Sequence, residues 1–334
     1  MKNVSKLHDF EVDTLLEKMT IRRIKFGEFR QLFELVGEAF KREEEITGLS
    51  VQRLRRLGRL YRLIEVLLPV FDLFHIDLET ILVAVSGNKL IGEIHVSPVG
   101  KGIWSLDSAA VDGMFRGHGV YKRLLNKSLE YIHRKGGRKA VTSLWTDNVA
   151  PVKMTNRLGF KVYAEEILLQ SEIDQLPSDV AAGADVSIRK MKQTDVKKVY
   201  RMSRVLNRER MEALEITEKD FVDPLVRRLR RRILWTRSER WVMEKGKEIV
   251  GYVHITYSSH QQAAEIMAFC VISTSGSSDL AVSMLREVLS FLRKENIRKV
   301  TTFLNKKWSE TIEIFKLFEF KPIASVYEMV KKIT

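Results

Sequence analysis

The stretch VDGMFRGHGVYKRLL, residues 111–125, joins two segments with different hydrophobic periods. Before it, IWSLDSAAV (103–111) alternates like a β-strand, and after it GVYKRLLNKSLEYIHRKGG (119–137) has the spacing of an amphipathic helix. Gly117 and Gly119 lie at the turn, where the absence of a Cβ allows a tight reversal. The first N–H groups of a helix have no partner within the helix and bind anions. The stretch therefore predicts a phosphate-binding loop.

The composition indicates a globular protein with a basic surface. The chain has 334 residues, 45% of them hydrophobic, and a net charge of +14. Its length predicts two domains, and its charge favours nucleic acid, an anionic membrane or a phosphate-bearing cofactor as partner. The single cysteine, Cys270, excludes an internal disulfide framework and any multi-cysteine metal site, so we expect no metal.

The chain starts without a signal-peptide pattern. Its most apolar window, 63–76, is shorter than the roughly 20 residues that span a bilayer. We therefore expect a cytoplasmic protein that does not cross a membrane.

The second half of the chain repeats the first. The matched segments, at offsets of 159, 160 and 167 residues, are 81–96 with 240–255, 137–144 with 297–304, and 20–24 with 187–191. One α/β unit has therefore been duplicated. We expect an N-terminal extension at 1–19, a first domain at 20–173, a polar linker at 174–185 and a second domain at 186–334.

Hydrophobic period and turn residues predict the elements of the first repeat. In chain order they are a strand at 20–24, helices at 29–40 and 51–68, strands at 82–85, 91–98 and 103–111, a helix at 119–135, a strand at 139–145, a helix at 150–158 and a strand at 160–169. This order predicts the α/β (α+β) class, with a mixed, twisted, mostly antiparallel sheet flanked by helices on both faces.

The loop lacks the Gly-Lys-Ser/Thr ending of the nucleotide P-loop and the third glycine of the dinucleotide fingerprint. It resembles the acyl-CoA loop of the GNAT superfamily of N-acetyltransferases, Arg/Gln-x-x-Gly-x-Gly/Ala, through Ala110-Val111, Arg116-Gly117-His118-Gly119 and Leu124-Leu125. Tyr121 departs from the family pattern, which usually has a small residue there.

A second signature lies downstream, in TDNVAPVKMTNRLGF (146–160), which resembles the family's asparagine, helix and Gly-Phe ending. The resemblance implies that Asn148 contacts the pantetheine arm. Thr155 takes the place of the family's tyrosine that protonates the leaving thiolate. Together the two signatures imply that acyl-CoA is bound by Ala109, Val111, Arg116, Gly117, His118, Gly119, Val120, Tyr121, Lys122 and Asn148.

Acetyl transfer to an amine requires a group that removes a proton, because an alkylamine is protonated at neutral pH. Glu93 and Asp107 are the candidates, with Asp107 placed first, and Thr155 is the candidate hydrogen-bond donor to the thiol. Strand alternation places Asp107 on the face of Ala109 and Val111. By family analogy, a main-chain amide near these two residues stabilises the oxyanion where the strand bulges.

The second repeat lacks most of these residues. At the offset of 160, Gly119 becomes Asp279 and Asn148 becomes Trp308, while Glu93 becomes Tyr252 at 159. His95 keeps a counterpart in His254, so we interpret His95 as structural. We therefore expect a degenerate second domain without a working acyl-CoA site.

The resemblance implies an acyl-CoA-dependent N-acyltransferase that moves acetyl from acetyl-CoA to a primary amine of a small-molecule or peptide acceptor by direct attack on the thioester. Arginines in 51–68 and 223–235 favour an acidic acceptor, or else form the solvated faces of amphipathic helices. The alternative is a non-catalytic acyl-CoA-binding or nucleic-acid-associated module on the same scaffold. Nucleic acid stays open as a less favoured partner, and we expect a monomer or a homodimer.

Overall fold

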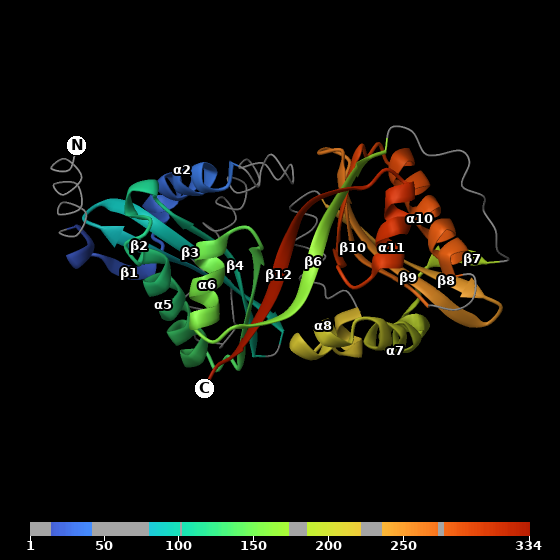
Figure 1. The fold of residues 1–334 in the computed structure, drawn as a ribbon, viewed down its shortest axis with the longest axis horizontal. Coiled ribbons are helices and arrows are strands. Elements are labelled where there is room, and N and C mark those ends of the chain that lie inside the picture. The colour runs from blue at the N-terminus through green and yellow to red at the C-terminus, as the bar shows by residue number, and fades with distance from the viewer. Residues whose placement is uncertain (1–14, 42–79, 101, 174–185, 222–235, 273–276) are drawn as a thin grey trace. The chain divides into compact units, whose positions relative to one another are not determined.

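The computed structural model describes residues 15–41, 80–100, 102–173, 186–221, 236–272 and 277–334 (Figure 1). The predicted linker and the two arginine-rich segments, 51–68 and 223–235, lie outside these residues. The chain divides into two compact units. The first unit comprises Met1–Leu144, Asn148–Val162 and Glu328–Thr334, and the second comprises Trp145–Asp147 and Tyr163–Tyr327.

The first unit contains a sheet in the order β1-β2-β3-β4-β5, followed by the end of β12. Strands β1 to β4 are antiparallel to their neighbours, whereas β4 and β5 are parallel. The elements of the first repeat are β1 (Thr20–Arg23), η1 (Phe26–Glu28), α2 (Phe29–Ala39), β2 (Thr80–Ser86), β3 (Lys89–Gly100), β4 (Ile103–Val111), η2 (Gly113–Phe115), α5 (Val120–Arg134), β5 (Lys139–Trp145), α6 (Val149–Arg157) and β6 (Lys161–Glu172).

The second unit contains the order β7-β8-β9-β10-β11-β6. Its strands repeat the pairing of the first unit, with β10 and β11 parallel and the others antiparallel. The elements of the second repeat are β7 (Ser187–Lys190), η3 (Gln193–Asp195), α7 (Val196–Leu206), α8 (Arg208–Ala213), η4 (Glu218–Phe221), β8 (Arg237–Lys245), β9 (Glu248–Ser258), β10 (Ala263–Val271), α10 (Ser277–Lys294), β11 (Lys299–Asn305), α11 (Ser309–Leu317) and β12 (Lys321–Lys332).

The predicted mixed, mostly antiparallel architecture is confirmed, but the closing strands are exchanged. Strand β6, expected to complete the first repeat, pairs with β11 from Lys299↔Glu172 to Asn305↔Glu166. Its buried Leu169 joins the hydrophobic core of the second unit. In the first unit the end of β12 takes the vacated edge, where the Ser143 hydroxyl donates to Glu328 at 2.6 Å. The period of 160–169 predicts a strand correctly, but a periodic pattern cannot name the partner strand.

Helices cover both faces of the first sheet. Helix α2 packs Leu32 and Leu35 against Val83 on one face. Helix α5 approaches the other face at Gly92, where a Cβ would lie 3.0 Å from Leu124 and 3.1 Å from Val120. None of the helices in the described ranges is long and apolar enough to cross a membrane.

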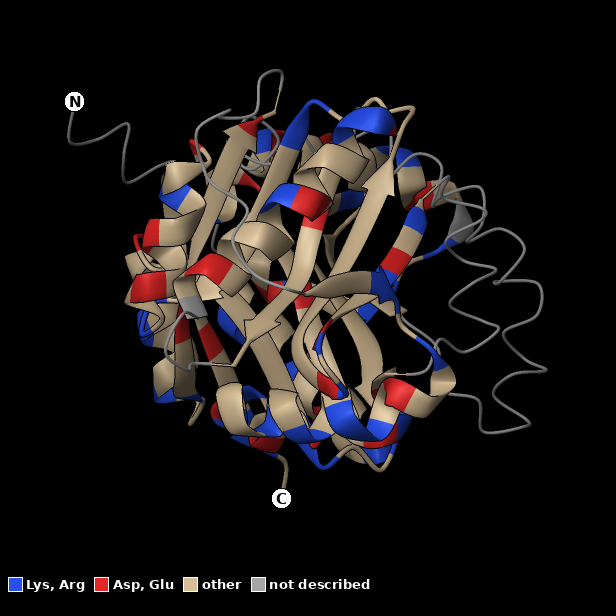
Figure 2. Ribbon diagram, turned by 90° about the vertical axis from the view of Figure 1, so that its right-hand side faces the viewer, with Lys and Arg blue, Asp and Glu red and all other residues tan. Residues whose placement is uncertain are grey.

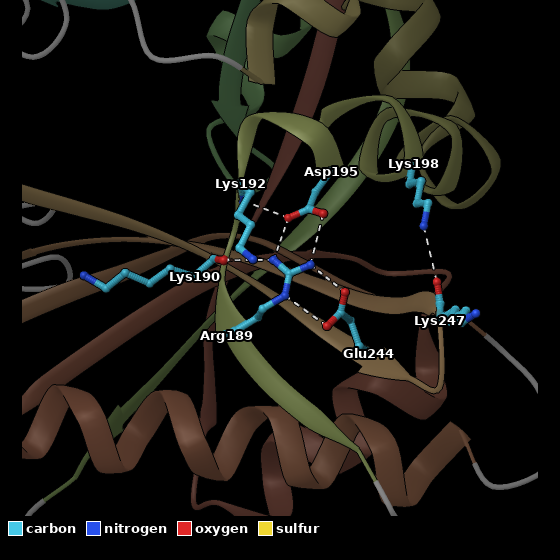
Figure 3. Close-up of polar contacts among 7 residues, drawn as sticks. All are labelled: Arg189, Lys190, Lys192, Asp195, Lys198, Glu244 and Lys247. Atoms are coloured by element: carbon cyan, nitrogen blue, oxygen red, sulfur yellow. Dashed lines mark hydrogen bonds and ion pairs between the residues drawn. The ribbon is translucent and has the colours of Figure 1, made fainter.

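An arginine near the start of each repeat ties the first strand to the first helix. In the second unit the Arg189 guanidinium donates to Asp195 at 2.6 and 3.0 Å and to Glu244 on β8 (Figure 3). Asp195, which is 6% exposed, also accepts from the Lys192 amide at 2.7 Å. In the first unit Arg22 binds Glu28 in the same way. These hydrogen bonds hold the pKa of Asp195 and of Glu244 below their ordinary values.

Replacing Arg189 with methionine is expected to destabilise the second unit at pH 7. The loss of both guanidinium hydrogen bonds by the largely buried Asp195 carboxylate costs about 1–3 kcal/mol. A carboxyl group whose pKa is lower in the folded than in the unfolded state stabilises the folded protein at pH values above its unfolded-state pKa. This stabilisation is lost as the pH falls through the folded-state pKa. The difference between parent and variant, measured by thermal denaturation, should therefore shrink below about pH 4.

The control is Arg208→Met, which removes the exposed Arg208–Glu212 pair, whose side chains are 76% and 60% exposed. It should leave the unfolding temperature nearly unchanged, because exposed pairs contribute little. Equal effects of the two substitutions at every pH would contradict the role given to Arg189.

Candidate active site

Strands β4 and β5 separate halfway along β4. Their parallel pairing covers only Ile103↔Lys139 to Leu106↔Thr142, and the Thr142 hydroxyl donates to the Leu106 carbonyl at 3.0 Å. Beyond Leu106, β4 keeps β3 as its neighbour on one side. The backbone edge that faced β5 is thereby released over the remaining residues of β4, which include Ala109 and Val111.

A β-bulge lies at the point of separation. His95 pairs with Ser108 and Val96 pairs with Leu106, so Asp107 is the extra residue of β4. The Asp107 carboxylate contacts the Ser97 hydroxyl and lies 3.4 Å from His95 Nδ1. It therefore points to the face of His95. The expectation that Asp107 shares a face with Ala109 and Val111 is wrong, because the extra residue breaks the alternation.

Glu93 lies on the same face of β3 as His95 and is only 1% exposed. It pairs across the strands with Ala110, and Ser108 donates to its carboxylate at 3.4 Å. Burial raises the pKa of Glu93 to about 7, although His95, Ser108 and the Ala110 main chain each act in the opposite direction. A carboxyl with this pKa exchanges a proton near neutral pH. Asp107, by contrast, is 39% exposed.

A tight turn follows β4 and orients the glycine loop. Asp112 accepts from the Met114 amide at 2.9 Å and binds the Lys89 ammonium at 2.8 Å. The Phe115 ring, 2% exposed, anchors the turn in the core. The turn thus fixes where the chain enters the loop at Arg116, whose Nε donates to the Val111 carbonyl at 3.1 Å.

The loop has the backbone conformation that its glycines predict. Gly117 has φ 85° and Gly119 has φ 79°, in the left-handed region. A Cβ at either position would meet no atom within 4 Å, so conformation, and not space, accounts for glycine here. A residue with a side chain costs about 1–2 kcal/mol in this region.

The main-chain amides around the start of α5 are available to a ligand. Within the described part of the chain, the amides of Gly117, Gly119, Val120, Tyr121 and Lys122 donate to no protein acceptor. The positive end of the helix dipole adds to their attraction for an anion. Arg116 and Lys122 are exposed beside them, and His118 is half-buried. The local geometry therefore fits a phosphate or diphosphate group.

Two residues of the predicted site meet through a contact that the sequence did not indicate. The Tyr121 hydroxyl lies 3.1 Å from the Thr155 hydroxyl on α6. Thr155 is fully buried, and burial raises the pKa of Tyr121 while the bond to Thr155 lowers it. Asn148 is the exposed N-cap residue of α6, and its side chain makes no cap hydrogen bond. A phenol therefore lies beside the position assigned to the family's tyrosine.

The second unit keeps the scaffold and changes the chemistry. It has the same bulge, now at Met267, and the same threonine bond, from Thr302 to Ile266 at 3.0 Å. Buried Tyr252 occupies the position of Glu93. Helix α10 begins at Ser277, so the counterpart of Gly119, Asp279, lies within its first turn. A helical turn thus replaces the left-handed glycine of the first unit.

Comparisons with known proteins agree with this geometry. Residues 51–160 match the family model described as Acetyltransferase (GNAT) family. A search of curated protein sequences gives no match. A GCN5-related N-acetyltransferase from Sphaerobacter thermophilus shares the fold at 13% identity and TM-score 0.64, covering 95% of this chain and 96% of that one. A tandem GNAT protein from the clavulanic acid biosynthesis pathway aligns at 12% identity and TM-score 0.62, covering 95% and 99%.

The family match includes strands β2 to β5, the glycine loop and helix α6, and the structural likeness extends over both repeats. Residues 51–160 thus resemble the GNAT family in sequence, and the chain shares its overall fold with proteins that carry tandem GNAT domains.

Proposed function

We propose that the chain is an acyl-CoA-dependent N-acyltransferase whose first unit transfers acetyl from acetyl-CoA to a primary amine. The observation that carries the proposal is the set of main-chain amides of Gly117, Gly119, Val120, Tyr121 and Lys122 that donate to no acceptor in the described part of the chain, beside the place where β4 leaves β5. The residues fit acetyl-CoA, the acyl donor. The amides and Arg116 would hold its diphosphate, and the Asn148 side chain would contact its pantetheine arm. When bound, acetyl-CoA supplies an activated acyl group as a thioester.

Glu93 is the general base of the proposal, ahead of Asp107. Its pKa of about 7 leaves a substantial basic fraction at neutral pH, so it accepts the proton that the acceptor ammonium must lose before attack. Asp107 is exposed and engaged with His95 and Ser97, which suits the rim of the acceptor site better than proton transfer at its centre.

Other groups stabilise the negative charge that develops on the acyl oxygen and on the leaving sulfur. Outward amides of Ala109 or Val111 stabilise negative charge that develops on the acyl oxygen. The C–N bond forms as the C–S bond breaks, the nitrogen loses its second proton as the amide forms, and the departing thiolate takes up one proton. The Tyr121 hydroxyl donates a hydrogen bond to the departing sulfur. Thr155 positions that hydroxyl through their 3.1 Å contact. This assignment replaces Thr155 with Tyr121 as the donor.

The acceptor is a small molecule or a peptide that carries a primary amine. The second unit is proposed to have no working acyl-CoA site, because Asp279 and an extended α10 stand where the first unit has its glycine loop. The alternative function is that of a protein that binds coenzyme A without catalysing acyl transfer. Such a protein would use the same glycine loop but would not require Glu93 or Tyr121.

Gly119→Asp, which introduces the second repeat's residue, is expected to weaken coenzyme A binding more than about tenfold. Left-handed strain and repulsion of the diphosphate both act against the complex. Isothermal titration calorimetry measures the affinity. Gly136→Asp is the matched control, since Gly136 also has a positive φ, 72°, with open space around it, but lies at the opposite end of α5. Equal losses in both variants would contradict phosphate binding at residue 119.

Glu93→Gln is expected to reduce kcat/KM for the amine by roughly 10²- to 10⁴-fold at neutral pH. The parent rate should rise with pH through about 7, as Glu93 loses its proton, and this limb should be absent in the variant. Because the pKa of Glu93 is raised in the folded protein, its ionisation lowers the free energy of unfolding as the pH rises. The Glu93→Gln variant should therefore be at least as stable as the parent protein at pH 8. Thiol release across a pH series is the assay. Loss of the limb in Asp107→Asn instead would assign the base to Asp107.

Tyr121→Phe removes the phenolic hydroxyl and keeps the ring. We expect kcat to fall by about tenfold or more, with little change in coenzyme A affinity, because only the bond to the leaving sulfur is lost. Thr155→Val should give a smaller fall, since it misplaces the hydroxyl without removing it. An unchanged kcat in Tyr121→Phe would exclude Tyr121 from the chemical step.

A further inference from the structure

The exposed face of helix α7, in the second unit, is a row of cations. Lys197, Arg201 and Arg204 follow each other at spacings of four and three residues, which places them on one side of the helix. The opposite side packs Val199 and Met202 into the core. Figure 2, which faces this unit, marks Lys and Arg in blue along its helices.

The corresponding helix of the first unit carries charges of both signs. Helix α2 is related to α7 by 167 residues, so that Arg30 matches Lys197 and Glu34 matches Arg201. Arg30 and Glu34 form an ion pair at 3.1 Å. The same scaffold position thus carries a carboxylate in one repeat and a guanidinium in the other, and general helix architecture does not account for the cations of α7.

These cations have no directly bonded acidic partner within the described ranges. Lys197, Arg201 and Arg204 make no ion pair or hydrogen bond with any described residue. Like charges three and four residues apart destabilise a helix. Arg208, at the start of α8, differs from these three cations because it has an acidic partner, Glu212. An anion bound along α7 would remove the repulsion.

The row lines a cavity of about 790 Å³. Its other walls include the half-buried Tyr200, the acidic Glu212 and Glu218, and Val205, which is 80% exposed. A volume of this size accommodates an organic ligand of nucleotide size. Val205 and the Tyr200 ring offer an apolar surface beside the cations, which suits a ligand that is more than an inorganic ion.

We propose that this cavity, the α7 cavity, binds an organic ligand that carries at least two phosphate groups. From Lys197 to Arg204 the helix rises about 10 Å, so successive phosphates can each meet a different cation. Arginine forks bind phosphate oxygens through two hydrogen bonds, and the ring of Tyr200 packs against the organic part. The site belongs to the second unit alone and does not depend on acyl transfer by the first.

The test is calorimetric titration at physiological ionic strength with three probes: inorganic tripolyphosphate, ATP and a pentathymidylate oligonucleotide. All titrations use the Gly119→Asp background, which keeps the first-unit loop from contributing. We expect saturable binding of ATP or of the oligonucleotide, tighter than that of tripolyphosphate. The better of the two identifies the source as a free nucleotide or a single-stranded nucleic acid.

Arg201→Glu is expected to weaken this binding at least about tenfold. The variant should fold, because Lys197 then gains the pairing that Arg30 has with Glu34 in the first unit. Arg30→Glu makes the same charge change on α2 and should leave the affinity unchanged. The proposal is overturned if no probe binds up to about 1 mM, if tripolyphosphate binds as tightly as the others, or if both substitutions weaken binding equally.

Discussion

The separation of β4 from β5 is the constraint on which the candidate site depends. In a continuous sheet the main chain of residues 107–111 would be hydrogen-bonded on both sides and closed to any ligand. The bulge at Asp107 ends the parallel pairing at Leu106 and directs the strand toward the turn anchored by Phe115. From there two left-handed glycines start α5 with its amides unpaired. In the proposed anion site the ligand contacts therefore come mainly from the backbone, with side chains beside them.

The two repeats show which parts of this arrangement belong to the scaffold. Both units have the β-bulge and the separation of the two parallel strands. Both also have a hydrogen bond from a threonine hydroxyl to the carbonyl of the last paired residue. Glu93, the positive-φ glycine at 119 and the late start of α5 occur in the first unit. The second unit has instead a cationic helix beside a cavity, in a region where the first unit has an internal ion pair. Duplication has therefore left one fold with two different polar surfaces.

Much of this structure follows from the sequence, because period and glycine spacing report local backbone. The strand at 103–111, the tight turn at the two loop glycines and the helix after Gly119 were predictable in this way. The exchange of β6 was not, since pairing partners are chosen by packing over long sequence distances. The bulge also escaped prediction and reversed the face of Asp107. The contact between Tyr121 and Thr155 depends on how α5 and α6 pack, which no spacing encodes.

The central claim is that a single coenzyme A site exists per chain, formed by main-chain amides at the start of α5. Its most direct measurement is the stoichiometry of coenzyme A binding to the full chain by calorimetry. One mole bound per mole of chain is the predicted result. Two equivalent sites, or none, would contradict the account.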